Sequence, residues 1–412
     1  MIKTLKNFLY FPVAHYFRFF AKIQLAIWKP KIIVVTGSSG KTTLLHLIQS
    51  QIGDKARYSH HANSAYGIPF DILGLKRKDL KPNEWLHLFL TAPFRAFKMP
   101  PEEKIYIVEA DCDRPREGKF LATLLKPEMT LWISSSLTHS VNFDRLNFPS
   151  TREAIAYEFG YFLEYTLEIA IANGDSLLVQ KQIKRTKVPV KFVNKKLLKE
   201  YKIFKDRTEF VIDNKKYSFN FILPKETFYS IEMTNILIEN LNLDHDYAFS
   251  KFYLPPGRCS IFKGIKNTTI IDSSYNATPD GVKTILEMFE QYQSANKWLV
   301  LGDMIELGKE EKEEHEKLGK ILKSMNLSNI ILVGPRVSKY THPQLGSGQT
   351  FNMPKDALNY LQANLKGGET ILFKGARFLE GIIEHLLADK QDISKLCRQE
   401  KAWKERRKQW GL

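Results

Sequence analysis

The sequence predicts an α/β protein with two successive sheet domains, and three observations support this prediction. A strand-like segment, a glycine turn and a helix-like segment follow one another over residues 31–52, KIIVVTGSSGKTTLLHLIQSQI. Strand-like and helix-like segments then alternate along much of the chain, which is typical of parallel sheets covered by helices. Pro255, Pro256 and Gly257 interrupt this alternation and indicate a domain boundary. We therefore expect an N-terminal segment at 1–30, a central domain at 31–254 and a C-terminal domain at 255–412.

Composition narrows the classes of partner. The 412 residues are 43% apolar and 26% charged, which is ordinary for a globular protein of two or three domains. The net charge of +16 favours anionic partners such as nucleotides or an anionic membrane surface. Since no aromatic-basic RNA motif or helix-turn-helix signature is present, we expect no nucleic acid partner. The three cysteines are far apart, which argues against disulfides or a zinc site and favours the reducing cytoplasm.

Residues 1–30 differ from the rest of the chain because they are rich in aromatic and basic residues and contain no acidic residue. Their longest uncharged run, 7–17, contains Pro12 and is too short to cross a bilayer. The segment lacks the features of a secretory signal. Two alternatives stay open: an amphipathic segment that lies peripherally on the inner face of the membrane, or a helix that packs on the body of the protein.

The stretch TGSSGKTT predicts a phosphate-binding loop. Ile32 to Val35 form a β-branched run suited to a buried parallel strand. The glycines permit a tight turn whose backbone N–H groups, with the start of the next helix, can cradle phosphate oxygens. Lys41 would reach the terminal phosphates and the Thr42 hydroxyl would hold magnesium. Val35 stands where the full motif has its first glycine. The predicted nucleotide-binding residues of this loop are Gly37, Ser38, Ser39, Gly40, Lys41, Thr42 and Thr43.

The remaining elements follow from apolar patterning. Residues 59–75 are expected to be a loop and 76–103 a surface excursion. In the rest of the central domain we expect strands at 104–110, 129–134, 177–179, 188–193, 209–211 and 215–223, and helices at 151–169 and 227–243. In the C-terminal domain we expect strands at 269–271, 298–301, 330–333 and 370–373, helices at 279–292, 309–325 and 378–387, and a solvated terminal helix over 395–410. This second alternation predicts a Rossmann-like sheet after the P-loop NTPase-type domain.

Polar residues follow several of these strands. Glu109 ends one strand and precedes Asp111 and Asp113, and His139 follows another. Because ligands bind beyond the carboxyl ends of strands in open α/β sheets, a carboxylate there can reach magnesium held by Thr42. Arg258 lies just past the predicted boundary, where a guanidinium can face phosphate across an interdomain cleft.

Taken in order, TGSSGKTT, NSAYGIP, VEAD, the strand-end His139, PPGR, IIDSSYNATP, LGDMIELG and FKGAR resemble the motifs of the Mur ligase family. These proteins are ATP-dependent amide ligases of peptidoglycan precursor synthesis. The phosphate loop is shared with many NTPases, whereas SYNATP, LGDMIELG and KGAR are far more specific. The resemblance covers roughly residues 31–390.

The resemblance implies roles for individual residues, with ATP and Mg²⁺ as cofactors. Thr42, Glu109 and His139 would be metal ligands. Residues implied to touch ATP beyond the phosphate loop are Arg258, Asp272, Asn276 and Pro279. Residues implied in catalysis are Lys41, His139, Lys374 and Arg377, the last two in the loop that faces the incoming amino component. The implied reaction forms an acyl phosphate from a carboxylate, which an amine then attacks.

Three departures from the family accompany the resemblance. Phe159 occupies the position of a lysine that is carbamylated in active members, and Tyr161 occupies the position of a glutamate. Glu158, which is adjacent to Phe159, is a candidate substitute for the lysine. Asp272 and Ser273 stand where the family has two acids. Only about 30 residues precede the first strand, so we expect the family's N-terminal UDP-binding domain to be absent.

The sequence therefore predicts a ligase that joins an amino acid or dipeptide to a carboxylate acceptor, with UDP-linked and lipid-linked muramoyl peptides as candidates. One alternative is a degenerate, non-catalytic ATP-binding scaffold of cell-wall synthesis. Another is a ligase for a folate-type or polyamino-acid acceptor, against which LGDMIELG and KGAR argue.

Overall fold

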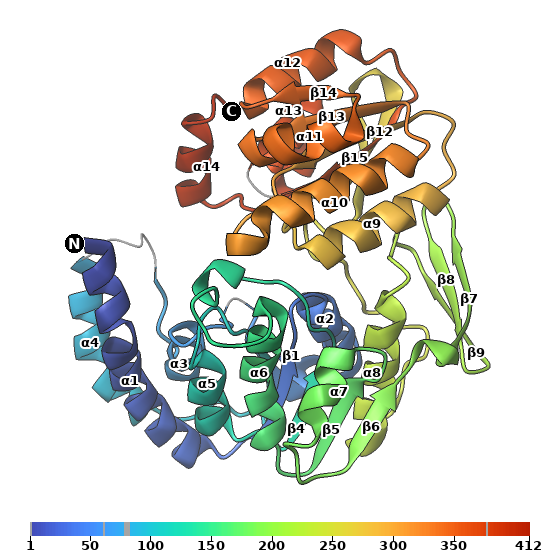
Figure 1. Ribbon diagram of the computed structural model, residues 1–412. Coiled ribbons are helices and arrows are strands. Elements are labelled where there is room, and N and C mark those ends of the chain that lie inside the picture. Colours follow the sequence, from blue (N-terminus) through green and yellow to red (C-terminus); the bar gives the residue numbers. More distant parts are fainter. Residues whose placement is uncertain (1, 61, 78–82, 376–377) are drawn as a thin grey trace.

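The computed structural model describes residues 2–60, 62–77, 83–375 and 378–412, with the backbone alone for 2–8. Two six-stranded sheets, each flanked by helices, lie one above the other in Figure 1. A small three-stranded sheet lies beside them. The predicted α/β class with two sheet domains is confirmed.

The first sheet is entirely parallel, in the order β2-β3-β1-β4-β5-β6. Its strands are β1 (Lys31–Thr36), β2 (Ala56–Tyr58), β3 (Ile105–Ala110), β4 (Met129–Trp132), β5 (Ile169–Asn173) and β6 (Val190–Val193). Alternate residues of β1 face opposite sides: Ile33 and Val35 pack with one cluster, Ile32 and Val34 with the other. Because both faces are buried, the strand reads as a continuous apolar run.

Helices cover both faces of this sheet. On the face of Ile33 lie α2 (Lys41–Ile52) and α8 (Thr227–Asn240). The opposite face carries α1 (Ile2–Trp28), α3 (Gly67–Leu73), α4 (Asn83–Ala96), α5 (Glu117–Leu125), α6 (Thr151–Glu164) and α7 (Leu177–Ile183). Helix α1 packs on α3 and α4 at the left edge in Figure 1.

The second sheet has the order β10-β11-β15-β12-β13-β14, with β10 antiparallel and the other strands parallel. Its strands are β10 (Ser260–Gly264), β11 (Thr268–Ser273), β12 (Lys297–Gly302), β13 (Asn329–Val333), β14 (Gln349–Phe351) and β15 (Thr370–Lys374). The helices of this part are α9 (Pro279–Gln291), α10 (Glu311–Ser324), α11 (His342–Leu345), α12 (Pro354–Asn364), α13 (Leu379–Leu386) and α14 (Lys401–Lys408).

The antiparallel sheet β7-β8-β9 lies at the right edge in Figure 1 and extends toward α9. Its strands are β7 (Leu198–Ile203), β8 (Thr208–Ile212) and β9 (Lys215–Phe219). Phe210, Tyr217 and Phe219 pack into the α8 side of the central core. Short turns of helix complete the fold: η1 (Gly53–Lys55), η2 (Ser140–Asn142), η3 (Lys195–Leu197), η4 (Ile265–Asn267), η5 (Gly308–Glu310), η6 (Val337–Thr341) and η7 (Lys390–Lys395).

Several element predictions were wrong. The predicted strand at 177–179 is the start of helix α7, because Ser176 caps it by accepting a hydrogen bond from the Val179 N–H. The helix predicted over 151–169 ends at Glu164, and strand β5 begins at Ile169. The predicted loop at 59–75 contains α3, and the predicted excursion at 76–103 contains α4.

The C-terminal tail was predicted to be a solvated helix, and most residues of α14 are exposed, but one side of it packs on the protein. Arg407 of α14 is buried, and its guanidinium lies 3.7 Å from the Glu380 carboxylate and 3.3 Å from that of Glu384. The tail therefore docks on α13. Among the helices described, none is long and apolar enough to cross a bilayer.

Candidate active site

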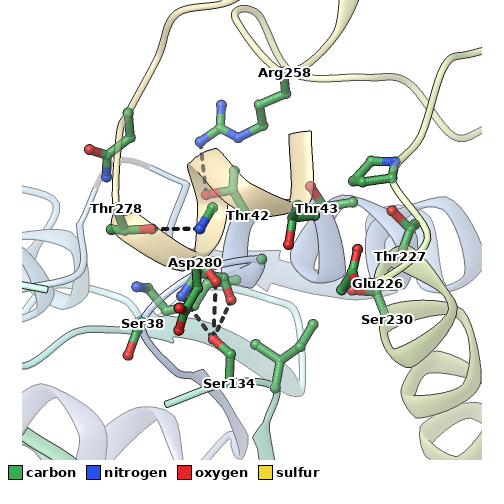
Figure 2. Close-up of a pocket in the computed structure, with 18 of the residues that line it drawn as sticks. Ser38, Thr42, Thr43, Ser134, Glu226, Thr227, Ser230, Arg258, Thr278 and Asp280 are labelled. Carbon is green, nitrogen blue, oxygen red and sulfur yellow. Dashed lines mark hydrogen bonds between the residues drawn. The ribbon is translucent and has the colours of Figure 1, made fainter. Parts of the chain in front are cut away.

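A cavity of about 490 Å³ lies where the central and C-terminal domains meet. Its central-domain wall is the loop between β1 and α2 with the ends of β3 and β4, and its other wall comes from the segments around Arg258 and 273–285. Figure 2 shows Arg258 above Thr42, with Asp280 above the phosphate loop. Most of the predicted nucleotide residues line this cavity: Ser38, Ser39, Gly40, Lys41, Thr42, Thr43, Arg258 and Asn276.

The phosphate loop is held against the segment after β4. The Ser38 hydroxyl donates to the Ser136 carbonyl at 3.0 Å and accepts from the Ser136 N–H at 2.7 Å. Gly37 has φ +135°, and a Cβ on it would lie 2.7 Å from the Ser134 carbonyl oxygen. Only glycine fits there, so Gly37 shapes the loop although it does not line the cavity.

Lys41 is buried at the start of α2. Its Nζ donates to the Gly37 carbonyl at 2.6 Å and lies 2.7 Å from Asp111 Oδ2. Burial opposes its charge, but Asp111 and Glu109 outweigh burial and raise the Lys41 pKa. Burial likewise opposes ionisation of Asp111, yet the neighbouring Lys41 holds the Asp111 pKa below its usual value. The pair is therefore an ion pair that fixes a positive charge beside the loop.

Thr42 connects the two domains. Its hydroxyl donates to Glu109 Oε1 at 3.3 Å. It also accepts from Arg258 Nη2 at 3.1 Å (Figure 2). Burial raises the pKa of Glu109, while Lys41 and Arg258 act to lower it. The predicted placement of Arg258 across an interdomain cleft from the phosphate loop agrees with this geometry.

His139 belongs to a second polar group. One ligand atom each from Asp111, Asp113 and His139 lies within 4.8 Å of the others. The imidazole Nε2 is 3.1 Å from Asp113 Oδ1, and Nδ1 is 2.6 Å from Glu306 Oε2 of the C-terminal domain. Burial opposes protonation of His139, but Glu306, Asp113 and Asp111 together raise its pKa to about 9.

The donors near the loop fit a hard divalent cation, because they are mainly carboxylate and hydroxyl oxygens. Glu109 lies with Thr42, and His139 lies with the two aspartates. The metal ligands Thr42, Glu109 and His139 stay predictions. Asp111 and Asp113, which were noted in the sequence without being assigned as ligands, are the additional candidates.

The loop that carries Asp113 is supported by α1. The buried Glu117 carboxylate accepts from the Asp113 N–H at 2.9 Å and from the Tyr10 hydroxyl at 3.0 Å. The Arg114 guanidinium lies over the Tyr10 ring, 3.5 Å from its centroid. Burial, with a contribution from Asp113, raises the Glu117 pKa to about 7. The first turns of α1 thus contact the residues that position a candidate metal ligand.

Lys374 lines the cavity on the C-terminal side, where its Nζ donates to the Asn276 carbonyl at 2.6 Å. Burial lowers the Lys374 pKa to about 8. Asp272 is fully buried and accepts from the Ser274 N–H. Neither Asp272 nor Pro279 is among the described residues that line the cavity. Arg377 lies outside the described residues.

Other residues that line the cavity were not predicted from the sequence. Figure 2 shows Glu226, Thr227 and Ser230 at the start of α8, facing the cavity opposite Asp280. No motif marks the α8 residues. Thr278 lies within the IIDSSYNATP motif but was assigned no role. Its hydroxyl caps α9 by accepting from the Gly281 N–H, and Thr-Pro before a helical pattern is a helix start signal.

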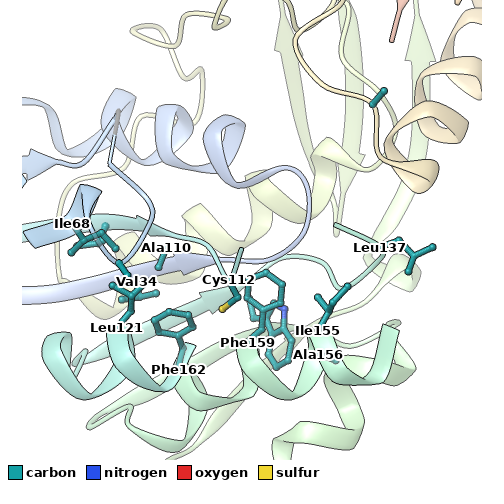
Figure 3. Packing of buried hydrophobic residues seen from close by; sticks show 14 of the residues in the cluster. Val34, Ile68, Ala110, Cys112, Leu121, Leu137, Ile155, Ala156, Phe159 and Phe162 are labelled. Carbon is teal, nitrogen blue, oxygen red and sulfur yellow. The ribbon is translucent and has the colours of Figure 1, made fainter. Parts of the chain in front are cut away.

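Phe159 lies in the apolar core. Its side chain is fully buried, and its ring centroid is 6.1 Å from that of Trp132. Figure 3 shows it beside Cys112, on the side of α6 that faces the sheet. Glu158, the candidate substitute for the family lysine, instead accepts hydrogen bonds from the Arg116 and Gly118 N–H groups at the start of α5. Its carboxylate is therefore occupied in capping a helix.

Polar contacts join the two domains around the cavity. The Lys309 N–H donates to Asp144 Oδ2 at 2.9 Å. Arg152 on α6 lies 3.6 Å from Asp280 and 3.3 Å from Glu314. With His139–Glu306 and Arg258–Thr42, these contacts hold the C-terminal domain over the phosphate loop.

Comparison with known proteins agrees with this architecture. Residues 35–237 match the family model of the Mur ligase middle domain, and residues 257–377 match that of the Mur ligase glutamate ligase domain. The chain belongs to the Mur ligase family, whose members are ATP-dependent amino-acid ligases.

Within the family, its relatives include UDP-N-acetylmuramoyl-tripeptide–D-alanyl-D-alanine ligases, the member to which SYNATP, LGDMIELG and KGAR point. The Bacillus subtilis (strain 168) enzyme is 23% identical over 386 residues, which are 89% of this chain and 78% of that protein. The Escherichia coli (strain K12) enzyme is 23% identical over 377 residues, 86% of this chain and 77% of that protein.

Solved structures show the same fold. The MurF ligase from Thermotoga maritima in complex with ADP has a TM-score of 0.73 at 21% identity, covering 93% of this chain and 84% of that one. Folylpolyglutamate synthase from Mycobacterium tuberculosis, complexed with ADP and AMPPCP, has a TM-score of 0.60 at 12% identity. The match covers 87% of this chain and 92% of that one.

Proposed function

We propose that this protein forms an amide bond through an acyl phosphate and adds an amino acid or a D-Ala-D-Ala-type dipeptide to a cell-wall precursor in the cytoplasm. One observation carries the proposal: a single cavity combines Lys41 and Thr42 of the phosphate loop with Arg258 and Lys374 of the C-terminal domain. These groups come from both domains, as a reaction between a nucleotide and two further substrates requires.

The chemistry follows from the charges in the cavity. A substrate carboxylate oxygen attacks the γ-phosphorus of ATP, the bond to the β-phosphate oxygen breaks, and ADP leaves. The amine nitrogen then attacks the acyl carbon, a C–N bond forms, and phosphate and a proton are released. Lys41 and Arg258 provide fixed positive charge where negative charge develops.

Magnesium fits the donor set near the loop, and it would be held by Thr42 and Glu109, with Asp111, Asp113 and His139 as the second group. When bound, it neutralises triphosphate charge. The Asp111–Lys41 ion pair positions the lysine, and the Glu109–Thr42 hydrogen bond orients the hydroxyl. Both contacts prepare the loop for an anionic nucleotide.

Support for the substrates comes from the relatives, whose names specify a muramoyl tripeptide and D-alanyl-D-alanine. Lys374 is a buried cation in the cavity, suited to the terminal carboxylate of an incoming dipeptide. Arg377 is the second proposed contact of that component. The acceptor is proposed as a UDP-linked or lipid-linked muramoyl peptide.

The test is phosphate release from ATP with a panel of acceptors and amines: UDP-linked and lipid-linked muramoyl tripeptide and a folate, each with D-Ala-D-Ala, D-Ala or L-Glu. We expect release only when a muramoyl acceptor and an amine are both present, with the amide product found by mass spectrometry. Release with the folate would replace the proposed acceptor. ATP binding without any product would favour the scaffold, for which the burial of Phe159 is the supporting observation.

A further inference from the structure

Helix α4 exposes a row of large apolar side chains. Leu86, Leu90 and Phe94 are spaced by four residues, and Phe97 and Met99 follow directly after the helix. These five residues, which we call the apolar stripe, are between 62% and 87% exposed. The spacing places the helical members on one face, while Leu88, Ala92 and Ala96 on the opposite face are buried.

The buried side of α4 packs on α1 and α3. Phe89 of α4 packs its ring on Phe17 at 5.1 Å and on Tyr16 at 4.9 Å. The Tyr16 hydroxyl also donates to the Phe89 carbonyl at 2.7 Å. Since packing with the body uses the other face, the stripe has no role in the core described here. Contiguous exposed apolar groups of this kind mark interaction surfaces.

Exposed basic residues lie on α1 and directly after α4. Helix α1 contains no acidic residue. Lys22 and Lys98 are exposed, and so is Phe19 of α1, by 60%. Of the acids nearby, Glu84 lies 3.9 Å from Arg77, and Glu102 and Glu103 lie beyond the stripe, where the Glu103 carbonyl accepts from the Trp28 indole. Exposed lysines beside an apolar row complement an anionic bilayer surface.

We propose that the face formed by α1 and α4 docks on an anionic lipid surface. The apolar stripe enters the boundary between headgroups and acyl chains, and the basic residues face the headgroups. With 14 residues, α4 rises only about 21 Å at 1.5 Å per residue, less than a bilayer core of about 30 Å. Docking therefore places α4 along the surface and not across it.

This proposal combines the two alternatives left open for the N-terminal segment. Ala14, Phe17, Ala21 and Trp28 are buried, so α1 packs on the body and contributes charge, whereas α4 contributes the apolar contact. Deleting residues 1–28 would remove part of the core and confound a binding test. Surface substitutions on α4 avoid that difficulty.

The experiment measures co-sedimentation of the full chain with vesicles of phosphatidylglycerol and phosphatidylcholine, or of phosphatidylcholine alone, at low and high salt. The variant carries Leu90→Glu and Phe94→Glu together. The matched control is Leu177→Glu, because Leu177 is 73% exposed and its helix, α7, lies well apart from α1 and α4 in Figure 1. Thermal unfolding verifies that all three proteins fold, and vesicle binding requires no turnover.

We expect the wild type and the control to bind phosphatidylglycerol vesicles, with binding weakened by salt. The double variant should partition at least about tenfold less, because charges replace two apolar side chains that would enter the lipid boundary. Wild type that stays in the supernatant at low salt, or equal binding by the double variant, overturns the proposal. A third outcome also overturns it: the wild type is a dimer that does not bind vesicles, and the double variant is a monomer. The stripe would then join two copies of the chain.

Discussion

The phosphate loop and helix α6 differ in their charged contacts, although the family resemblance assigns catalytic residues to both. At the loop, Lys41 pairs with Asp111, and Thr42 contacts both Glu109 and Arg258. On α6, Phe159 occupies the position that the family resemblance assigns to a carbamylated lysine, and it is fully buried. The comparison teaches that the residues predicted to meet the triphosphate make ionic contacts, whereas the residue predicted to stand at the lysine position is part of the apolar core.

We expect the largest effect on activity from a substitution in the phosphate loop. Lys41→Ala should lower ATP turnover at least about 10³-fold, because a fixed positive charge is removed from the triphosphate. Phosphate release measures the loss, and circular dichroism checks that the fold is retained. The control is Lys191→Ala on the exposed edge of β6, which should keep wild-type turnover.

The same change leaves Asp111 buried without its partner, which costs stability. A second variant, Lys41→Ala with Asp111→Asn, should recover stability but not turnover. Unchanged turnover in either variant would contradict the phosphate-loop assignment and remove the contrast with α6.

The next largest effect is expected on thermal stability, from a substitution on α6. Phe159→Lys should lower the melting temperature by about 10 °C, because it loses apolar contacts worth about 3–5 kcal/mol and buries a charge. Phe159→Leu should lower the melting temperature less, because leucine is also apolar. Thermal unfolding compares the three proteins. If Phe159→Lys instead raised the ligation rate, the native site would be a weakened version of the family's.

A smaller effect is expected at Lys374. Burial holds its pKa at about 8, below the 10.5 of an ordinary lysine. Between these values the unfolded chain binds more protons than the folded one, so the contribution of Lys374 to stability rises with pH across that window. Compared with Lys374→Met, the wild type should therefore gain up to about 3 kcal/mol from pH 8 to pH 10.5. Urea unfolding at both pH values measures the gain, and a constant difference between the two proteins would contradict it.

The last prediction is that added bicarbonate has no effect on the ligation rate. Because Phe159 cannot be carbamylated, ligation at low pH should be independent of added bicarbonate. Rates in carbon dioxide-free buffer with and without bicarbonate measure this. A bicarbonate-dependent rate would mean that another lysine takes the role and that the alignment of α6 is wrong.

Much of the fold and part of the site could be predicted from sequence because parallel strands leave clear signals. The β-branched run of β1 and its glycine turn locate Lys41 and Thr42, and Glu109 is located at the end of β3. In a parallel sheet the carboxyl ends of neighbouring strands meet, so residues distant in sequence could be expected to share one cavity.

The rest depends on tertiary contacts. His139 and Glu306 are 167 residues apart, and Lys374 and Asn276 are 98 apart, so no local pattern links them. Helix α4 contains Pro93 and has basic flanks, which made it resemble a surface loop. Helix α7 begins with a short apolar run that periodicity alone cannot distinguish from a strand.

The contact between Tyr10 and Glu117 has a thermodynamic consequence. Glu117 holds both the Tyr10 hydroxyl and the backbone of Asp113, so α1 and a candidate cation ligand share one carboxylate. If lipid binding alters these contacts and with them the affinity for the cation, the cation alters the affinity for lipid by the same factor. A cation titration in the presence and absence of vesicles would then give one coupling free energy from either direction.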